Sequence, residues 1–190
     1  MKDKKYIIFD LDGTLVDSFP TVVNACKRVV EGYASVTIPS NEFFDNYHSK
    51  DMEQMFVELS KLLNISAEEF RKRYDAQYAL DSLTSTTVIS QQYLILNDAK
   101  ARGIGIIVLT NKKQELAETV CRTILGDNAI DAIIGRKDTQ PIKPRHVLIE
   151  RFRELGINPK KQCLMYYGDS QSDYETAKLL NIEYNNTKII

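Results

Sequence analysis

The chain has 190 residues, 43% of them hydrophobic and 27% charged, which is typical of a globular protein with one core, or with a core and a smaller appended unit. Its formal net charge of −1 argues against nucleic acid or an anionic membrane as a partner. No apolar run approaches the roughly 18 residues of a membrane span. Three widely spaced cysteines (Cys26, Cys121 and Cys163) without a C-x-x-C pattern favour a reducing, cytoplasmic setting.

A short buried strand is predicted near the start of the chain. The apolar residues Tyr6–Phe9 are followed at once by Asp10, Asp12 and Gly13, and an apolar run that ends in a turn signal is typical of a strand in a parallel sheet. Open parallel sheets bind their ligands beyond the carboxyl ends of the strands. The sequence therefore predicts that the two carboxylates lie where such a sheet places its chemistry.

A long helical segment follows this strand. Between residues 18 and 102 apolar side chains recur at helical spacing, and Ser66–Glu69 forms a capping box. Residues 82–87 are rich in serine and threonine and predict a linker. Because residues 17–87 are too long for a crossover between two strands, we expect them to form an inserted helical domain. The helices expected in this part of the chain are 19–30, 52–63, 66–80 and 89–101.

Strands and helices alternate in the remainder of the chain. Such alternation implies a doubly wound parallel sheet, so the expected architecture is an α/β core of residues 1–16 and 88–190. The expected strands are 104–109, 132–134, 163–167 and, as a candidate fifth, 182–184. The helices expected between and after them are 114–125, 145–155 and 170–180.

Four clusters of polar residues follow predicted strands or precede predicted helices, and at least three of them should converge at one edge of the sheet. Carboxylates brought that close repel one another, because a like-charge pair at about 4 Å costs on the order of 4 kcal/mol at an effective dielectric of about 20. Such a cluster needs a cation, and an all-oxygen ligand set suits Mg²⁺. The clusters are Asp10/Asp12, Thr110/Asn111, Lys143 and Asp169/Asp173.

The four clusters resemble, in order, the motifs of the haloacid dehalogenase (HAD) superfamily, and most of all its phosphoglycolate phosphatase-like branch. The resemblance covers nearly the whole chain. It implies a Rossmann-like core with an all-helical cap, residues 17–87, and a Mg²⁺-dependent phosphatase that acts on a small phosphorylated metabolite through an aspartyl-phosphate. The matching segments are Asp10-Leu-Asp-Gly-Thr14, Thr110-Asn-Lys112, Lys143-Pro144 and Gly168-Asp-Ser-Gln-Ser-Asp173.

The resemblance also implies a role for each matching residue. Asp10 would attack phosphorus, and Asp12 would protonate the leaving oxygen and then deprotonate the hydrolytic water. The Thr110 hydroxyl and the Asn111 backbone N–H would hold the phosphoryl oxygens, and Lys143 would offset the developing charge.

The same resemblance implies a Mg²⁺ site. Its ligands would be Asp10, the backbone carbonyl of Asp12, and Asp169, with Asp173 as a further ligand or as support for the ligands. A simpler structural role remains open for Asp173, which lies three residues after Ser170 and could complete a capping box.

Other functions of the same fold remain as alternatives to a phosphatase. Asp12 argues against a dehalogenase, because halide leaves without a proton, whereas a phosphomutase would share all four motifs. A non-catalytic phosphate-binding protein of the same fold would usually lack Asp10, Asp12 or Lys143. The segment 17–88 carries 7 Lys/Arg and 11 Asp/Glu residues, a net charge of −4, which disfavours a large polyanion as substrate. The chain also departs from the branch after residue 179, where we expect an abbreviated sheet edge.

Overall fold

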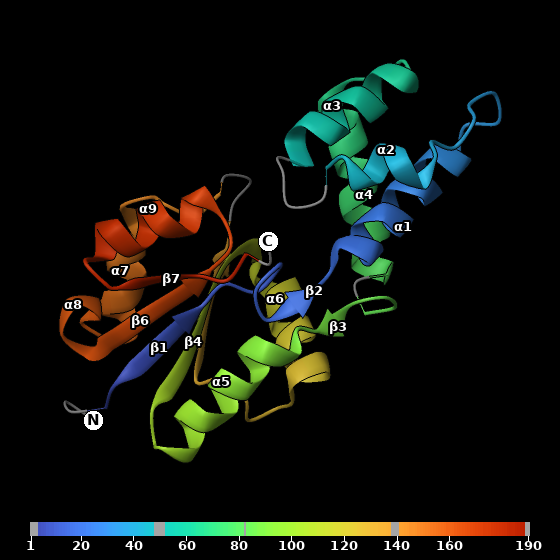
Figure 1. The fold of residues 1–190 in the computed structure, drawn as a ribbon. Helices are drawn as coiled ribbons and strands as arrows, with labels where there is room; N and C mark the ends of the chain where they lie inside the picture. The colour runs from blue at the N-terminus through green and yellow to red at the C-terminus, as the bar shows by residue number, and fades with distance from the viewer. Residues whose placement is uncertain (1–3, 48–51, 82, 138–140, 189–190) are drawn as a thin grey trace. The chain divides into compact units, whose positions relative to one another are not determined.

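The computed structural model describes residues 4–47, 52–81, 83–137 and 141–188, and its chain divides into two compact units (Figure 1). One unit, called here the α/β unit, consists of Met1–Asp17 and Thr87–Ile190. The other, the helical unit, is Ser18–Thr86. The boundaries expected from the sequence, after residue 16 and before residue 88, each lie one residue from these limits.

A five-stranded parallel sheet of order β5-β4-β1-β6-β7 forms the centre of the α/β unit. All four residues of β1 are buried, as expected for a central strand that is covered on both faces. The predicted α/β class with a doubly wound parallel sheet is therefore confirmed. The strands are β1 (Tyr6–Phe9), β4 (Gly105–Lys113), β5 (Ala132–Arg136), β6 (Cys163–Gly168) and β7 (Tyr184–Asn186).

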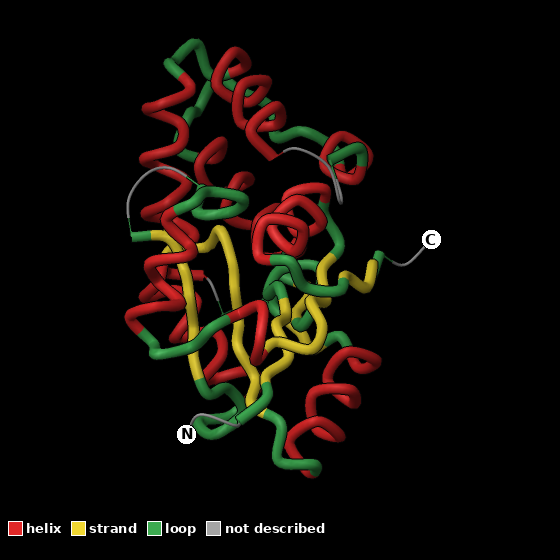
Figure 2. The backbone as a smooth tube through the Cα atoms, turned by 90° about the vertical axis from the view of Figure 1, so that its left-hand side faces the viewer, coloured by secondary structure: helices red, strands yellow, loops and turns green. Residues whose placement is uncertain are grey.

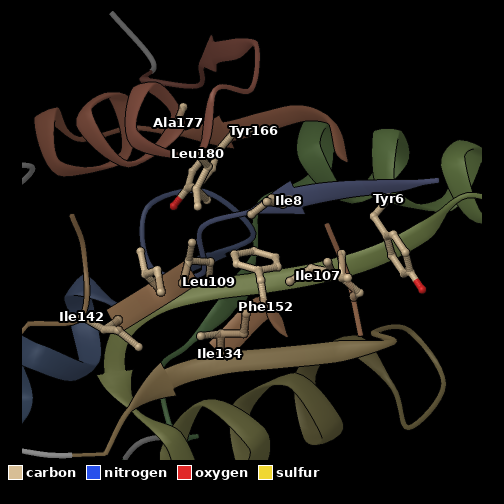
Figure 3. Close-up of a cluster of buried hydrophobic side chains, with 12 residues drawn as sticks. Tyr6, Ile8, Ile107, Leu109, Ile134, Ile142, Phe152, Tyr166, Ala177 and Leu180 are labelled. Atoms are coloured by element: carbon tan, nitrogen blue, oxygen red, sulfur yellow. The ribbon is translucent and has the colours of Figure 1, made fainter. Parts of the chain in front are cut away.

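Helices flank the strands of this unit on both sides (Figure 2). A cluster of buried apolar side chains joins one face of the sheet to α7 and α9, with Ile8 and Ile107 from the strands meeting Phe152 and Leu180 from the helices (Figure 3). Each large apolar side chain buried in this way contributes about 1.5–3 kcal/mol. The helices are α5 (Ser90–Ala101), α6 (Gln114–Val120), α7 (Val147–Glu154), α8 (Pro159–Gln162) and α9 (Gln171–Leu180), and a π-helical turn, η1 (Cys121–Leu125), follows α6.

The helical unit is held together by an apolar and aromatic core. In it α4 packs against both α1 and α3. The ring of Phe56 lies 5.6 Å from that of Phe70 and 4.5 Å from that of Tyr74, measured between centroids. Aromatic pairs at such distances add to the free energy of apolar burial. The helices are α1 (Phe19–Glu31), α2 (Asn41–Asp45), α3 (Met52–Leu62) and α4 (Ala67–Asp81).

Short elements account for most differences from the sequence-based expectations. The strands β2 (Val16–Asp17) and β3 (Thr87–Val88) form an antiparallel ribbon at the point where the chain leaves and re-enters the α/β unit. This ribbon, α2 and α8 were not predicted, and β7 begins two residues later than the expected strand 182–184. None of the described helices is long and apolar enough to cross a membrane.

Candidate active site

The turn that follows β1 brings the first carboxylate of the site into the interior. Asp10 directly follows the strand and is 6% exposed. Gly13 adopts a φ of +81°, and a Cβ atom at this position would lie 2.6 Å from Oδ2 of Asp169. Only glycine combines this backbone conformation with such a close approach. The turn therefore places the Asp169 carboxylate directly against the segment that carries Asp10.

A buried lysine links two carboxylates of the site. The Nζ atom of Lys143 lies 2.7 Å from Oδ1 of Asp10 and 2.6 Å from Oδ1 of Asp173, with 3% of the lysine side chain exposed. Although burial alone would lower the pKa of Lys143, the charges of Asp10 and Asp173 raise it above its ordinary value. Lys143 therefore presents a fixed positive charge beside Asp10.

The loop that carries Lys143 is held by the side chain of Asn111. The Oδ1 atom of Asn111 accepts hydrogen bonds from the backbone N–H groups of Ile142 and Lys143, both at 2.9 Å. Asn111 lies near the carboxyl end of β4, so this strand sets the position of the loop. The sequence implied a role only for the backbone of Asn111, and this function of its side chain was missed.

Asp173 is fully buried and uses both carboxylate oxygens. Oδ1 accepts from Lys143 and, at 2.9 Å, from the hydroxyl of Tyr166, whereas Oδ2 accepts from the backbone N–H (3.1 Å) and hydroxyl (2.5 Å) of Ser170. These four donors match the number of lone-pair sites of a carboxylate. Ser170 and Asp173 also form the capping box of α9. In this arrangement Asp173 caps the helix and anchors Lys143.

The second glycine with a structural requirement is Gly168, at the end of β6. A Cβ atom at this position would lie 2.5 Å from the Cβ atom of Asp173. Burial alone would raise the pKa of Asp173, but Lys143 and the hydrogen bonds from Ser170 and Tyr166 lower it on balance. Gly168 therefore leaves the space that Asp173 occupies, and Lys143 with the two hydrogen-bond donors favours the ionised form of Asp173.

The end of β4 contributes a hydroxyl group and a second lysine. Thr110 is 2% exposed, and its Oγ1 atom accepts from the backbone N–H of Lys112 at 3.1 Å. The Nζ atom of Lys112 lies 2.8 Å from Oδ1 of Asp12. Lys112 belongs to the Thr-Asn-Lys segment of the sequence but received no role there. Its position two residues after Thr110, on the same side of an extended chain, was the available signal.

Three carboxylates of the site lie close together, because oxygen atoms of Asp10, Asp169 and Asp173 lie within 4.8 Å of one another. Since four donors occupy the lone pairs of Asp173, Asp10 and Asp169 are the two that fit a divalent cation. Burial and the charge of Asp173 raise the pKa of Asp10 well above its usual range, and the same two causes raise the pKa of Asp169.

The balance of charges at the site also favours a bound divalent cation. Among the residues that the structure describes, the four predicted carboxylates of Asp10, Asp12, Asp169 and Asp173 face the ammonium groups of Lys112 and Lys143, which leaves two negative charges in this set. One Mg²⁺ would balance them, and it prefers oxygen ligands of this kind. The residues present therefore fit the expected metal.

Comparison with known proteins identifies the family of the chain. The haloacid dehalogenase-like hydrolase family matches residues 7–186. The phosphoglycolate phosphatase of Colwellia psychrerythraea is 27% identical, over 96% of this chain and 84% of that protein. A Caldanaerobacter subterraneus protein provisionally named as a pyrophosphatase is 24% identical, over 90% of this chain and 76% of that protein.

Solved structures with a similar fold are found as well. A Thermotoga maritima protein provisionally named β-phosphoglucomutase aligns with a TM-score of 0.73 at 22% identity, covering 96% of this chain and 84% of that chain. The prediction of a hydrolytic enzyme with a HAD-type core is confirmed by the family match. From residue 7 to residue 186, the chain belongs to the haloacid dehalogenase-like hydrolase family.

Proposed function

We propose that this hydrolase is a Mg²⁺-dependent phosphatase that removes the phosphoryl group of a small phosphomonoester through an aspartyl-phosphate on Asp10. The observation that carries the proposal is the buried Asp10 carboxylate, bonded to Lys143 at 2.7 Å, with the Asp169 carboxylate within 4.8 Å. This pairing places a carboxylate nucleophile beside groups that neutralise the negative charge of a phosphoryl group.

In the first step a carboxylate oxygen of Asp10 forms a bond to phosphorus as the bond from phosphorus to the leaving oxygen breaks. Asp12 gives its proton to that oxygen, so the product leaves as an alcohol. The hydroxyl of Thr110 and the ammonium of Lys143 bind the equatorial phosphoryl oxygens, where charge develops. Mg²⁺, held by Asp10, the Asp12 carbonyl and Asp169, would supply further neutralisation of that charge.

In the second step water attacks the phosphorus of the aspartyl-phosphate. Asp12, now ionised, takes a proton from this water, and the bond between phosphorus and the Asp10 oxygen breaks. Inorganic phosphate leaves, and both carboxylates return to their starting states. Asp173 takes no direct part, because its two oxygens hold Lys143 and cap α9.

The relatives' names favour phosphate release over phosphate transfer within the substrate. Two are named for hydrolysis of phosphoglycolate or pyrophosphate, whereas the mutase name comes from a structure at 22% identity. A phosphomutase remains the second candidate, since it would use the same residues. A non-catalytic binding protein is disfavoured because Asp10, Asp12 and Lys143 are all present.

We further propose that the helical unit acts as a cap that selects the substrate, and that the enzyme works in the cytoplasm. The net-acidic segment 17–88 favours a small substrate over a nucleic acid or another large polyanion. The three cysteines are free thiols, in keeping with a reducing setting.

The test is a screen of phosphate release from p-nitrophenyl phosphate, 2-phosphoglycolate, pyrophosphate and sugar phosphates, with and without Mg²⁺. We expect release that requires Mg²⁺ and disappears in Asp10→Asn. Full activity in excess chelator, or in that variant, would contradict the proposal. Conversion of a sugar 1-phosphate to its 6-phosphate without release would identify the mutase instead.

A further inference from the structure

We propose that Lys112 is a positioning residue for Asp12: its ammonium group fixes the carboxylate that exchanges protons with the leaving group and with water. The inference rests on the function proposed above and extends it to a residue for which neither the sequence motifs nor the relatives supply a role. The juxtaposition that carries it is the contact of 2.8 Å between Nζ of Lys112 and Oδ1 of Asp12.

The side chain of Lys112 is almost completely buried. Only 8% of its side chain is exposed, whereas lysines are almost never buried to this extent unless they are paired. An ammonium group removed from water without a partner is costly, so the contact with Asp12 helps to hold the Lys112 side chain in place. By contrast, Arg102 and Asp98 form an ion pair with 68% of each side chain exposed, and pairs of that kind contribute little.

Lys112 also lies between two groups of the site. Its backbone N–H donates to Oγ1 of Thr110, and its side chain reaches Asp12. Because the Thr110 oxygen accepts this bond, its own proton remains available for a phosphoryl oxygen. One residue at the end of β4 therefore orients both the phosphate-binding hydroxyl and the proton-transferring carboxylate.

The contact also determines which oxygen of Asp12 exchanges the proton. The Lys112 ammonium can donate to Oδ1 whether Asp12 is ionised or protonated, so the proton is carried on Oδ2. Holding one orientation of the carboxyl group in advance lowers the entropic cost of aligning Oδ2 with the leaving oxygen.

The two lysines of the site therefore have separate functions. Lys143 bonds Asp10 and Asp173 and acts on charge at phosphorus, which every substrate develops. Lys112 acts on proton delivery, which only a basic leaving group needs. Loss of Lys112 should consequently lower kcat for substrates with alkyl leaving groups more than kcat for p-nitrophenyl phosphate. Loss of Lys143 should lower kcat for both kinds of substrate to a similar extent.

The experiment measures kcat and KM for p-nitrophenyl phosphate and for an alkyl phosphate found active in the screen, in Lys112→Met, Lys112→Gln and Lys112→Arg. The control is Lys160→Met, which removes an exposed lysine in α8, before the start of β6. We expect kcat of the neutral variants on the alkyl phosphate to fall on the order of tenfold further than on p-nitrophenyl phosphate, with KM little changed, because general acid catalysis supplies about 10²–10⁴-fold. Lys112→Arg should recover part of the loss.

A double-mutant cycle separates positioning from a general structural defect. In an Asp12→Ala background, Lys112→Met should have no further effect on kcat for the alkyl phosphate. An equal loss on both substrates, or an additive loss in the cycle, would overturn the role of Lys112 while leaving the phosphatase intact. If the wild-type protein releases phosphate from no substrate, the proposed function itself fails.

Discussion

Buried polar residues are arranged differently in the two units of the chain. In the α/β unit the carboxylates of Asp10, Asp169 and Asp173 crowd together at one edge of the sheet, and burial keeps the pKa of Asp10 well above its usual range. In the helical unit the buried Asp81 carboxylate is paired with Arg28 at 3.3 Å and accepts from Gln77 at 2.8 Å. The crowded carboxylates of the α/β unit lower its stability but provide groups for catalysis, whereas the paired carboxylate of Asp81 stabilises the helical unit.

The largest expected effect comes from Asp10→Asn. Removing the nucleophile should lower turnover by more than about 10⁴-fold. The midpoint of chemical denaturation, measured without metal, should stay the same or rise, because the substitution relieves repulsion from Asp169 and Asp173. A variant that loses both activity and much of its stability would contradict the contrast between the units.

Metal removal should have the next largest effect. Excess chelator should abolish turnover, and Mg²⁺ added to the chelated protein should raise its free energy of unfolding by about 2.7 kcal/mol when its concentration is roughly 100 times Kd. Thermal unfolding followed by circular dichroism checks the second part. Asp169→Asn should lose this stabilisation, and its retention would exclude Asp169 as a ligand.

Asp12→Ala should separate proton transfer from metal binding. Turnover of an alkyl phosphate should fall about 10²–10⁴-fold, because general acid catalysis is lost. The stabilisation by Mg²⁺ should persist, since only the backbone carbonyl of Asp12 is expected to bind the metal. Unchanged turnover, or loss of the Mg²⁺ effect, would each refute this division of roles.

In the helical unit we expect the opposite pattern from Asp81→Ala. Its side chain is 7% exposed, and removing it deletes the ion pair with Arg28 and the hydrogen bond from Gln77, so the free energy of unfolding should fall by about 1–3 kcal/mol. The kcat for p-nitrophenyl phosphate should change little at a temperature where the variant is folded. The exposed Asp98→Ala is the matched control and should alter neither quantity appreciably.

The smallest effect is predicted for Tyr166→Phe. The substitution removes only the hydroxyl that donates to Asp173, so Lys143 loses part of its anchoring, and turnover should fall a few-fold with a stability loss of about 1 kcal/mol. Tyr184→Phe removes a hydroxyl that donates to the backbone carbonyl of Gly168 instead, and is the control. If the control loses as much turnover as Tyr166→Phe, the link through Asp173 is not specific.

The sequence predicted the sheet and the residues at its edge because both depend on simple patterns. Apolar runs that end in polar residues locate parallel strands, and the carboxyl ends of such strands meet. Alternation places Lys112 on the same side of β4 as Thr110, but it does not predict the contact of Lys112 with Asp12 or those of the Asn111 side chain. These contacts depend on the irregular pairing of β4 with β5 between Leu109 and Lys113.

Length explains the other elements that were missed. The strands β2 and β3 have two residues each, too few to show a period, and α8 has four. In the helical unit the spacing of apolar residues predicted the three longer helices, α1, α3 and α4. The spacing of apolar residues could not identify a substrate, because it reflects only how the helices pack against one another within the unit.

The most direct test of the account is to identify the phosphorylated residue. The wild-type enzyme is mixed with a slowly hydrolysed phosphomonoester and Mg²⁺, quenched in acid within one turnover, digested and analysed by mass spectrometry. The account predicts one phosphoryl group on the peptide that contains Asp10, and none in Asp10→Asn. A phosphoryl group on any other residue, or single-turnover product formation without a phosphorylated enzyme, would contradict it.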